Sequence, residues 1–319
     1  MRRIACLVLA IIFFGLPAPL LAESWPQRVV RIIIPLGAGS ATDIAGRLYA
    51  DQLSKRWGQP VIIENRPGAD LMIGTGTVAA ARDDHTLLLS PASPITVNPL
   101  THDKLPYDPA DLIPISRATE VYVGISVPAS LKVNSLDEFV ALARSQPGKL
   151  NWAATPGSTY LTFAAFQKSA NLPVANVPYR DIVQAQNDLA EERIHVMMCA
   201  IAIVQPQILT GKLKLLAVTN AERAATAADT PTVREAGYPA LELSGPVGFF
   251  GSRAMSRELR ERISADIRAV AADRDIAKRL LATGQVLRAS TPDEYAALIE
   301  GQRAHFAELA RTIGLRPGE

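Results

Sequence analysis

Residues 31–43, Arg31-Ile-Ile-Ile-Pro-Leu-Gly-Ala-Gly-Ser-Ala-Thr-Asp43, join an apolar run to a loop of small residues. The apolar run predicts a strand over 29–34 that ends at Pro35, and a helical pattern begins at about Thr42. Small residues let the backbone come close to a ligand, and free N–H groups at a helix start attract an anion. The stretch therefore predicts an anion site made of main chain, although a tight turn without a ligand explains the loop equally well.

Strand and helix patterns alternate outward from this loop. A helical pattern covers 42–57, strand patterns cover 61–63 and 86–89, and a helix rich in small residues lies between these strands at 73–81. This alternation is typical of an α/β fold with a parallel sheet covered by helices on both faces. A second unit of the same style is expected between 121 and 219, and three helices without intervening strands are expected to close the chain on the first unit.

Two crossings between these units, near 118–124 and 242–248, divide the chain into two lobes. We expect residues 23–121 and 247–319 to form the first lobe and residues 122–246 to form the second. Two crossings between lobes form a natural hinge around a cleft. Ligands of parallel sheets bind beyond the carboxyl ends of the strands, which is where the loops at 36–43, 90–96 and 155–159 are expected.

The first 22 residues have the pattern of a secretory signal peptide. Arg2 and Arg3 precede an apolar stretch over 4–16, and Ala22 is a suitable last residue before cleavage; an uncleaved anchor helix is the alternative. Cleavage would leave equal numbers of basic and acidic residues, so the charge indicates neither nucleic acid nor an anionic membrane as a partner. Only Cys199 would remain of the two cysteines, so no internal disulfide is expected.

Signatures of catalysis and metal binding are missing from the sequence. It contains no Gly-x-Ser-x-Gly elbow, no His-Glu-x-x-His motif and no paired cysteines, and its four histidines are scattered. The pattern Gly74-x-Gly76-x-x-Ala79 resembles a dinucleotide-binding motif, but no strand directly precedes it. We therefore expect a protein that is not an enzyme and that holds neither a cofactor nor a metal.

Most candidate ligand residues lie in polar loops of small residues that follow predicted strands. The candidates are Leu36, Gly37, Ala38, Gly39, Ser40, Thr42, Asp43, Ser90, Ser93, Thr155, Gly157, Ser158, Thr159, Tyr179 and Arg180. The last two lie at the end of a short strand predicted over 176–179. Asp43 is expected to serve structure by accepting N–H bonds in the first helical turn. Tyr179 and Arg180 would add an aromatic wall and a cation, although a solvated arginine after a strand is as good an interpretation.

Many short motifs in order resemble the substrate-binding receptors of tripartite tricarboxylate transporters, the Bug family. The resemblance extends over the whole chain after residue 22, and its motifs lie at 25–35, 39–43, 58–69, 73–74, 105–109, 146–151, 177–180, 211–219 and 231–237. It implies a two-lobed receptor of the type II periplasmic binding-protein fold, with two α/β domains joined by a hinge of two crossings. It also implies a monomer in the periplasm that closes on a small organic carboxylate, holds it largely through backbone N–H groups and delivers it to membrane permease subunits.

The sequence departs from the family pattern at several positions. Leu36 stands where phenylalanine is usual, Asp70 and Leu71 stand where the family commonly has glycines, and Cys199 replaces an aspartate that commonly ends a strand. The resemblance thus adds Cys199 to the candidate ligand residues, and a carboxylate with a less polar body is one interpretation of the changes. Two other functions stay open: a receptor that feeds a two-component sensor kinase, and an exported enzyme on the same scaffold.

Overall fold

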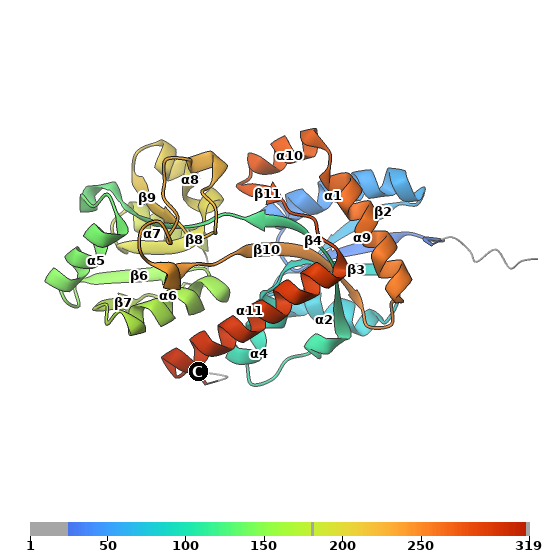
Figure 1. Cartoon of the computed structure of the whole chain (residues 1–319), viewed down its shortest axis with the longest axis horizontal. Helices are drawn as coiled ribbons and strands as arrows, with labels where there is room; N and C mark the ends of the chain where they lie inside the picture. Colours follow the sequence, from blue (N-terminus) through green and yellow to red (C-terminus); the bar gives the residue numbers. More distant parts are fainter. Residues whose placement is uncertain (1–24, 180–181, 317–319) are drawn as a thin grey trace, which may run out of the picture.

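The computed structural model describes residues 25–179 and 182–316, which form two α/β lobes (Figure 1). Each lobe is built on one sheet, with strand order β11-β4-β10-β3-β1-β2 in the first lobe and β7-β6-β8-β5-β9 in the second. The first sheet contains β1 (Val30–Ile34), β2 (Val61–Asn65), β3 (Thr86–Pro91), β4 (Leu112–Val121), β10 (Gly245–Ser252) and β11 (Gln285–Leu287). The second contains β5 (Val123–Pro128), β6 (Leu150–Ala154), β7 (Val174–Asn176), β8 (Val196–Ala200) and β9 (Leu213–Val218). This confirms the predicted two-lobed α/β fold.

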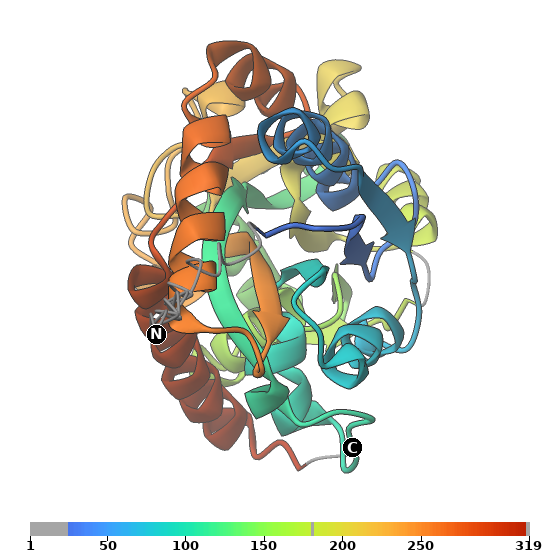
Figure 2. The ribbon, with the colours of Figure 1, turned by 90° about the vertical axis from the view of Figure 1, so that its right-hand side faces the viewer.

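Helices cover both faces of the first sheet. The helices of the first lobe are α1 (Ala41–Trp57), α2 (Met72–Ala81), α3 (Ser93–Thr96), α4 (Asn98–Thr101), α9 (Arg257–Ala271), α10 (Arg274–Leu281) and α11 (Pro292–Ile313). Ile32 of β1 belongs to the apolar cluster under α1, α9 and α10, whereas Ile33 belongs to the cluster under α2 and α11. Figure 2 shows α1, in dark blue, and α2, in cyan, on opposite sides of this sheet.

The second sheet is covered in the same way by α5 (Leu136–Ser145), α6 (Ser158–Ser169), α7 (Ile182–Ala190) and α8 (Ile201–Leu209). Short 3₁₀ turns complete the structure at Pro109–Asp111, Ala129–Leu131, Ala225–Ala227 and Pro239–Leu241. None of the helices within the described residues combines the length and the apolar character needed to cross a bilayer. The predicted signal peptide, 1–22, lies outside the described residues.

Both sheets are mixed, which corrects the prediction of parallel sheets. β1 pairs in parallel with β2 and β3, and β6 pairs in parallel with β7 and β8, as the alternating pattern predicts. However, β10 is antiparallel to β3 and β4, and β5 is antiparallel to β8 and β9. β4, β5 and β10 are the strands that meet at the two crossings, where the chain enters each sheet without an intervening α-helix (Figure 1).

The sequence pattern misses several elements, among them β4, α8 and β11. In β4, Pro114 and polar residues interrupt the apolar run, and α8 follows β8 without any turn signal between them. β11 has only three residues, and it lies between α10 and α11, so the prediction of closing helices without intervening strands is wrong. β7 also begins at Val174, two residues before the strand that the sequence pattern predicts over 176–179.

Asn220 and its neighbour Thr219 hold the two crossings together. The Asn220 side chain accepts a hydrogen bond from the backbone N–H of Val123 (2.9 Å) and donates one to the carbonyl oxygen of Val121 (3.1 Å). The hydroxyl of Thr219 donates to the carbonyl oxygen of Leu243 (3.1 Å), just before β10. Asn220 therefore binds the first crossing, while Thr219, whose hydroxyl also lies 3.3 Å from the carbonyl oxygen of Val123, binds both. The lobe boundaries at 121/122 and 246/247 stay our proposal.

The last helix, α11, packs against both lobes rather than against the first alone (Figure 1). Tyr295 and Ile299 lie in an apolar cluster of the first lobe, whereas Phe306 and Ala310 lie in the main cluster of the second. The helix begins with a complete capping box at Thr291, as its sequence predicts. One continuous helix thus contributes to the cores of both lobes.

The start of α2 lies so close to the first loop that Gly74 has no room for a side chain. A Cβ on Gly74 would lie 2.8 Å from the Cβ of Pro35 and 2.9 Å from the carbonyl oxygen of Arg66. Gly76 in the same helix has more space, since its Cβ would lie 3.8 Å from the nearest atom of Tyr107. Gly74 therefore lets the helix pack directly on the loop that follows β1.

We predict that Gly74→Ala destabilises the protein by about 1–3 kcal/mol, because the new methyl group would overlap backbone and proline atoms. Gly76→Ala is the matched control in the same helix, and we expect it to leave stability unchanged or to raise it by up to about 1 kcal/mol. Denaturant-induced unfolding measures both changes. Equal midpoints for the two variants would contradict the close packing of α2 on the loop.

Candidate functional site

Two helices, one from each lobe, begin at the predicted ligand loops with backbone donors that are not used. The hydroxyl of Ser40 caps α1 by accepting from the N–H of Asp43 (3.2 Å), while α6 begins after Gly157 without a capping side chain. Within residues 25–179 and 182–316, no group accepts from the backbone N–H of Ala41, Thr42, Ser158 or Thr159. Each helix start therefore presents two free donors together with the positive end of a helix dipole.

The loops of the two lobes meet at Ser93 and Gly157. A Cβ on Gly157, whose φ is 90°, would lie 3.6 Å from the Cβ of Ser93. β1 and β3 are neighbouring parallel strands, so the loop 36–43 and the Ser93 segment follow them at the same edge of the sheet. The structure therefore brings together the first loop, Ser93 and the start of α6.

Ser90 is different, since it is buried and its hydroxyl donates to the carbonyl oxygen of Pro91 (2.8 Å).

The carboxylate of Asp43 holds the first loop in shape. The side chain is only 3% exposed, and it accepts hydrogen bonds from the N–H of Gly39 (2.9 Å), from Arg47 Nε and Nη2 (both 3.0 Å) and from Asn65 Nδ2 (3.0 Å). Burial alone would raise the pKa of Asp43, but these hydrogen bonds outweigh it and hold the pKa below its ordinary value. Asp43 thus has the predicted structural role, although its backbone donor precedes the helix instead of lying in the first turn.

Asn65 is a supporting residue that the sequence analysis missed. Besides its bond to Asp43, its Nδ2 donates to the carbonyl oxygen of Leu36 (3.0 Å). Asn65 ends β2, beside β1, and a polar side chain at the carboxyl end of a strand was the signal that could have identified it. The loop is therefore fixed near both of its ends, at Leu36 and at Gly39.

The remaining residues of the first loop divide by exposure. Gly37, Ala38 and Gly39 are exposed, and Gly39 has a φ of 83°, a conformation that glycine adopts without strain. Leu36 is partly buried against the apolar cluster under α1, and Thr42 is buried. The exposed residues of the loop are thus two glycines and one alanine, so little side chain separates its main chain from solvent.

Thr155 supplies an unused hydroxyl beside the start of α6. Its carbonyl oxygen accepts from the hydroxyl of Thr159 and from the N–H of Tyr160 (3.2 Å). Its own Oγ1 is buried and has no hydrogen-bond partner among the described residues. A buried hydroxyl without a partner costs about 1–3 kcal/mol, so Thr155 is a natural place for a bound polar group.

Two further candidate residues are engaged within the second lobe, and a third lies outside the described residues. The hydroxyl of Tyr179 donates to Asp188 (2.7 Å), which also binds Arg193 (2.6 Å), and burial together with Asp188 raises the pKa of Tyr179 to about 12. Arg180 lies outside the described residues. Cys199 is fully buried in an apolar cluster, and burial raises the pKa of its thiol to about 12. The geometry gives no support to Cys199 as a ligand residue, because its side chain belongs to the core.

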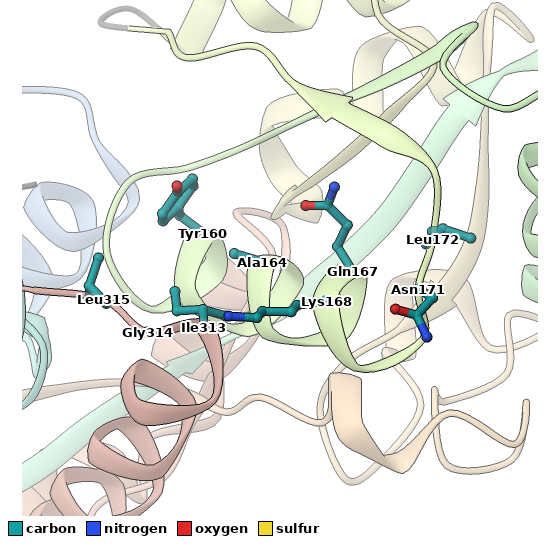
Figure 3. Close-up of a pocket in the computed structure, with 9 residues that line it drawn as sticks. All are labelled: Tyr160, Ala164, Gln167, Lys168, Asn171, Leu172, Ile313, Gly314 and Leu315. Atoms are coloured by element: carbon teal, nitrogen blue, oxygen red, sulfur yellow. The ribbon is translucent and has the colours of Figure 1, made fainter.

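A hollow of about 600 Å³ lies between α6 and the end of α11 (Figure 3). Its lining includes Tyr160, Gln167, Lys168 and Leu315, but none of the predicted ligand residues that the structure describes. Lys168, the cation among the described lining residues, has its ammonium 3.8 Å from the position of a Cβ on Gly314, at the C-terminal end of α11. A cation at this position stabilises the helix terminus, so the charge of Lys168 is accounted for by the fold.

The sequence has relatives of nearly the same length. A UPF0065 protein of Bordetella bronchiseptica is 30% identical over 317 residues, which cover 98% of this chain and 93% of that protein. The protein BugT of Bordetella pertussis is 28% identical over 320 residues, which cover 99% of this chain and 98% of its own.

Solved structures share the fold. Rpa4515 of R. palustris, solved with adipate, has a TM-score of 0.81 and 28% identity, covering 92% of this chain and 99% of its own. MatC from Rhodopseudomonas palustris, solved with bound malate, has a TM-score of 0.76 and 25% identity, covering 89% of this chain and 99% of its own. The periplasmic binding protein BugD has a TM-score of 0.77 and 25% identity, covering 92% of this chain and all of its own.

The family described as "Tripartite tricarboxylate transporter family receptor" matches residues 45–315, which include α6, α11 and most of α1. The relatives and the solved structures agree with this match over both lobes. The chain therefore belongs to the receptor family of the tripartite tricarboxylate transporters, a family of solute-binding proteins.

Proposed function

We propose that this chain captures a small organic carboxylate between its lobes and delivers it to the permease subunits of a tripartite tricarboxylate-type transporter. The observation that carries this proposal is the pair of helix starts, α1 and α6, with free N–H groups on opposite lobes. Helix N-termini bind anions through such donors and through the helix dipole. Arg47, the cation nearest in sequence to this site, is engaged in a bidentate bond with Asp43, so main chain would supply the recognition.

The ligands of the structural neighbours support a carboxylate. One neighbour was solved with adipate and another with malate, and both compounds are dicarboxylates. We infer that one carboxylate of the ligand of this chain binds at the start of α1 and α6, with Thr155 as an additional hydrogen-bonding group. Selectivity for the rest of the ligand would come from the side chains around these donors.

We further propose that residues 1–22 direct export and that the protein acts in the periplasm as a monomer. The family supports a binding role instead of catalysis, because its members are receptors. A receptor of this kind needs only reversible binding and a conformation that the permease subunits recognise.

A thermal-shift screen with mono- and dicarboxylates, including adipate and malate, tests the ligand class. A ligand present at 100 times its dissociation constant should add about 2.7 kcal/mol to the free energy of unfolding. Neutral sugars and amines serve as the comparison set. Saturable stabilisation by a neutral compound, with none from any organic anion, would contradict the proposal.

Ser158→Pro tests whether the main chain of α6 holds the ligand. Proline is tolerated at the first helical position and removes one backbone donor, so we expect binding at least about tenfold weaker with the fold retained. Ser158→Ala keeps the donor and should bind like the unmodified protein. Arg257→Pro makes the same change at the start of α9 and controls for the effect of proline itself. Isothermal titration with the best acid from the screen measures the affinity of all three variants. If Ser158→Pro bound the acid as tightly as the unmodified protein does, a main-chain site at the start of α6 would be refuted.

Asp43→Asn tests the carboxylate that supports the first loop. We expect a loss of about 2 kcal/mol in stability at neutral pH, because the ionised form makes the hydrogen bonds. Since the folded pKa of Asp43 is below its ordinary value of about 3.9, its contribution exists above that value and is lost as the pH falls through the folded pKa. Unfolding curves at several pH values should therefore converge for the two proteins in acid.

Asp51→Asn, in the same helix, is the control for this change. Asp51 is exposed and pairs with Lys55 (2.8 Å), so we expect a change below about 0.5 kcal/mol. If both substitutions had equally small effects, Asp43 would not be the support of the loop.

A further inference from the structure

The segment that follows β2 has an unusual backbone. Gly68, Ala69, Asp70 and Leu71 all have positive φ angles, of 121°, 46°, 48° and 69°. Glycine adopts such angles freely, but the other three residues carry a Cβ that makes the left-handed region unfavourable. Three successive residues in this region form a strained turn, which persists only where the surrounding structure enforces it.

Hydrogen bonds from α2 and from the α3–α4 segment enforce the turn. The buried side chain of Asn98 donates from Nδ2 to the carbonyl oxygen of Asp70 (2.8 Å), and Nε2 of His102 lies 3.1 Å from Oδ2 of the same residue. The carbonyl oxygen of Leu71 accepts from the hydroxyl of Thr75 (2.8 Å). The main chain of the turn is thus bound on both sides.

The strained turn connects the two ligand loops of the first lobe. On one side, the backbone N–H of Arg66 donates to the carbonyl oxygen of Ile34 (2.8 Å), and Gly74 packs against Pro35 at the start of the loop 36–43. On the other side, Asn98 and His102 belong to the segment that begins with Ser93, the residue that meets Gly157 of the second lobe. The turn therefore lies between two groups that a bound ligand would have to contact together.

Packing of the side chain does not explain why leucine, and not glycine, occupies position 71. It is partly exposed and is a member of none of the buried apolar clusters formed by the described residues. A residue with a Cβ does, however, restrict the backbone more than glycine does. The strained residues thus make the backbone of the turn stiffer, and they lower the free energy of unfolding.

We propose that Asp70 and Leu71 are positioning residues that fix the spacing between the loop 36–43 and the Ser93 segment, and thereby the affinity for the carboxylate. This inference rests on the proposed function for its effect on binding. The positioning itself is a property of the protein without ligand and can be measured separately.

The test is Leu71→Gly, with Lys132→Gly as the matched control. Lys132 has a φ of 58°, is exposed and lies in the second lobe, so its replacement relieves the same kind of strain away from the loops. We expect both variants to raise the Tm by about 1–4 °C. Only Leu71→Gly should weaken binding of the best acid from the thermal-shift screen, by at least threefold in titration calorimetry.

Hydrogen–deuterium exchange without ligand provides the second measurement. In Leu71→Gly, the hydrogen-bonded amides of Gly39 and Asp43 should exchange at least threefold faster than in the unmodified protein, and in Lys132→Gly they should not change. Unchanged exchange in Leu71→Gly, a lower Tm, or unchanged affinity for an acid that the unmodified protein binds would each overturn the positioning role. If the unmodified protein bound no acid, the proposed function would fail, while the exchange rates would still decide whether the turn positions the loop.

Discussion

The first ligand loop depends on a single buried carboxylate. Asp43 binds Gly39 in the loop, Arg47 in α1 and Asn65 at the end of β2, so three elements meet on one side chain. The two bonds from Arg47 also compensate its negative charge, which would otherwise repel an anion nearby. A carboxylate can therefore support an anion site, because its charge is paired while the N–H groups at the helix start stay free.

The two lobes are joined by more than their crossings. Phe306 of α11 is buried in the core of the second lobe, although Tyr295 of the same helix is buried in the first. Val97, which lies between α3 and α4 in the Ser93 segment, also lies in the second-lobe core. A change in the angle between the lobes would therefore have to repack the last helix, and this would limit how far the ligand loops can separate.

Local patterns in the sequence predict the loops well and the sheet only in part. The loops at 36–43 and 155–159 are marked by small residues between a strand and a helix, and a helix begins within each of them. The antiparallel direction of β10 is not encoded in its apolar run, because periodicity shows which face is buried and not the direction of the neighbours. The burial of Cys199 likewise depends on α7 and on α8, a helix that the sequence pattern misses, and Asn65 acts through a contact that only the sheet creates.

The central claim is that free main-chain donors from both lobes hold one carboxylate. A crystal structure of the protein with its tightest-binding organic acid tests this most directly. The account predicts one carboxylate group within hydrogen-bonding distance of N–H groups at the starts of both α1 and α6, directly or through one water molecule. An acid bound elsewhere, for example in the hollow beside Lys168, with the donors of Thr42 and Ser158 still free, would contradict it.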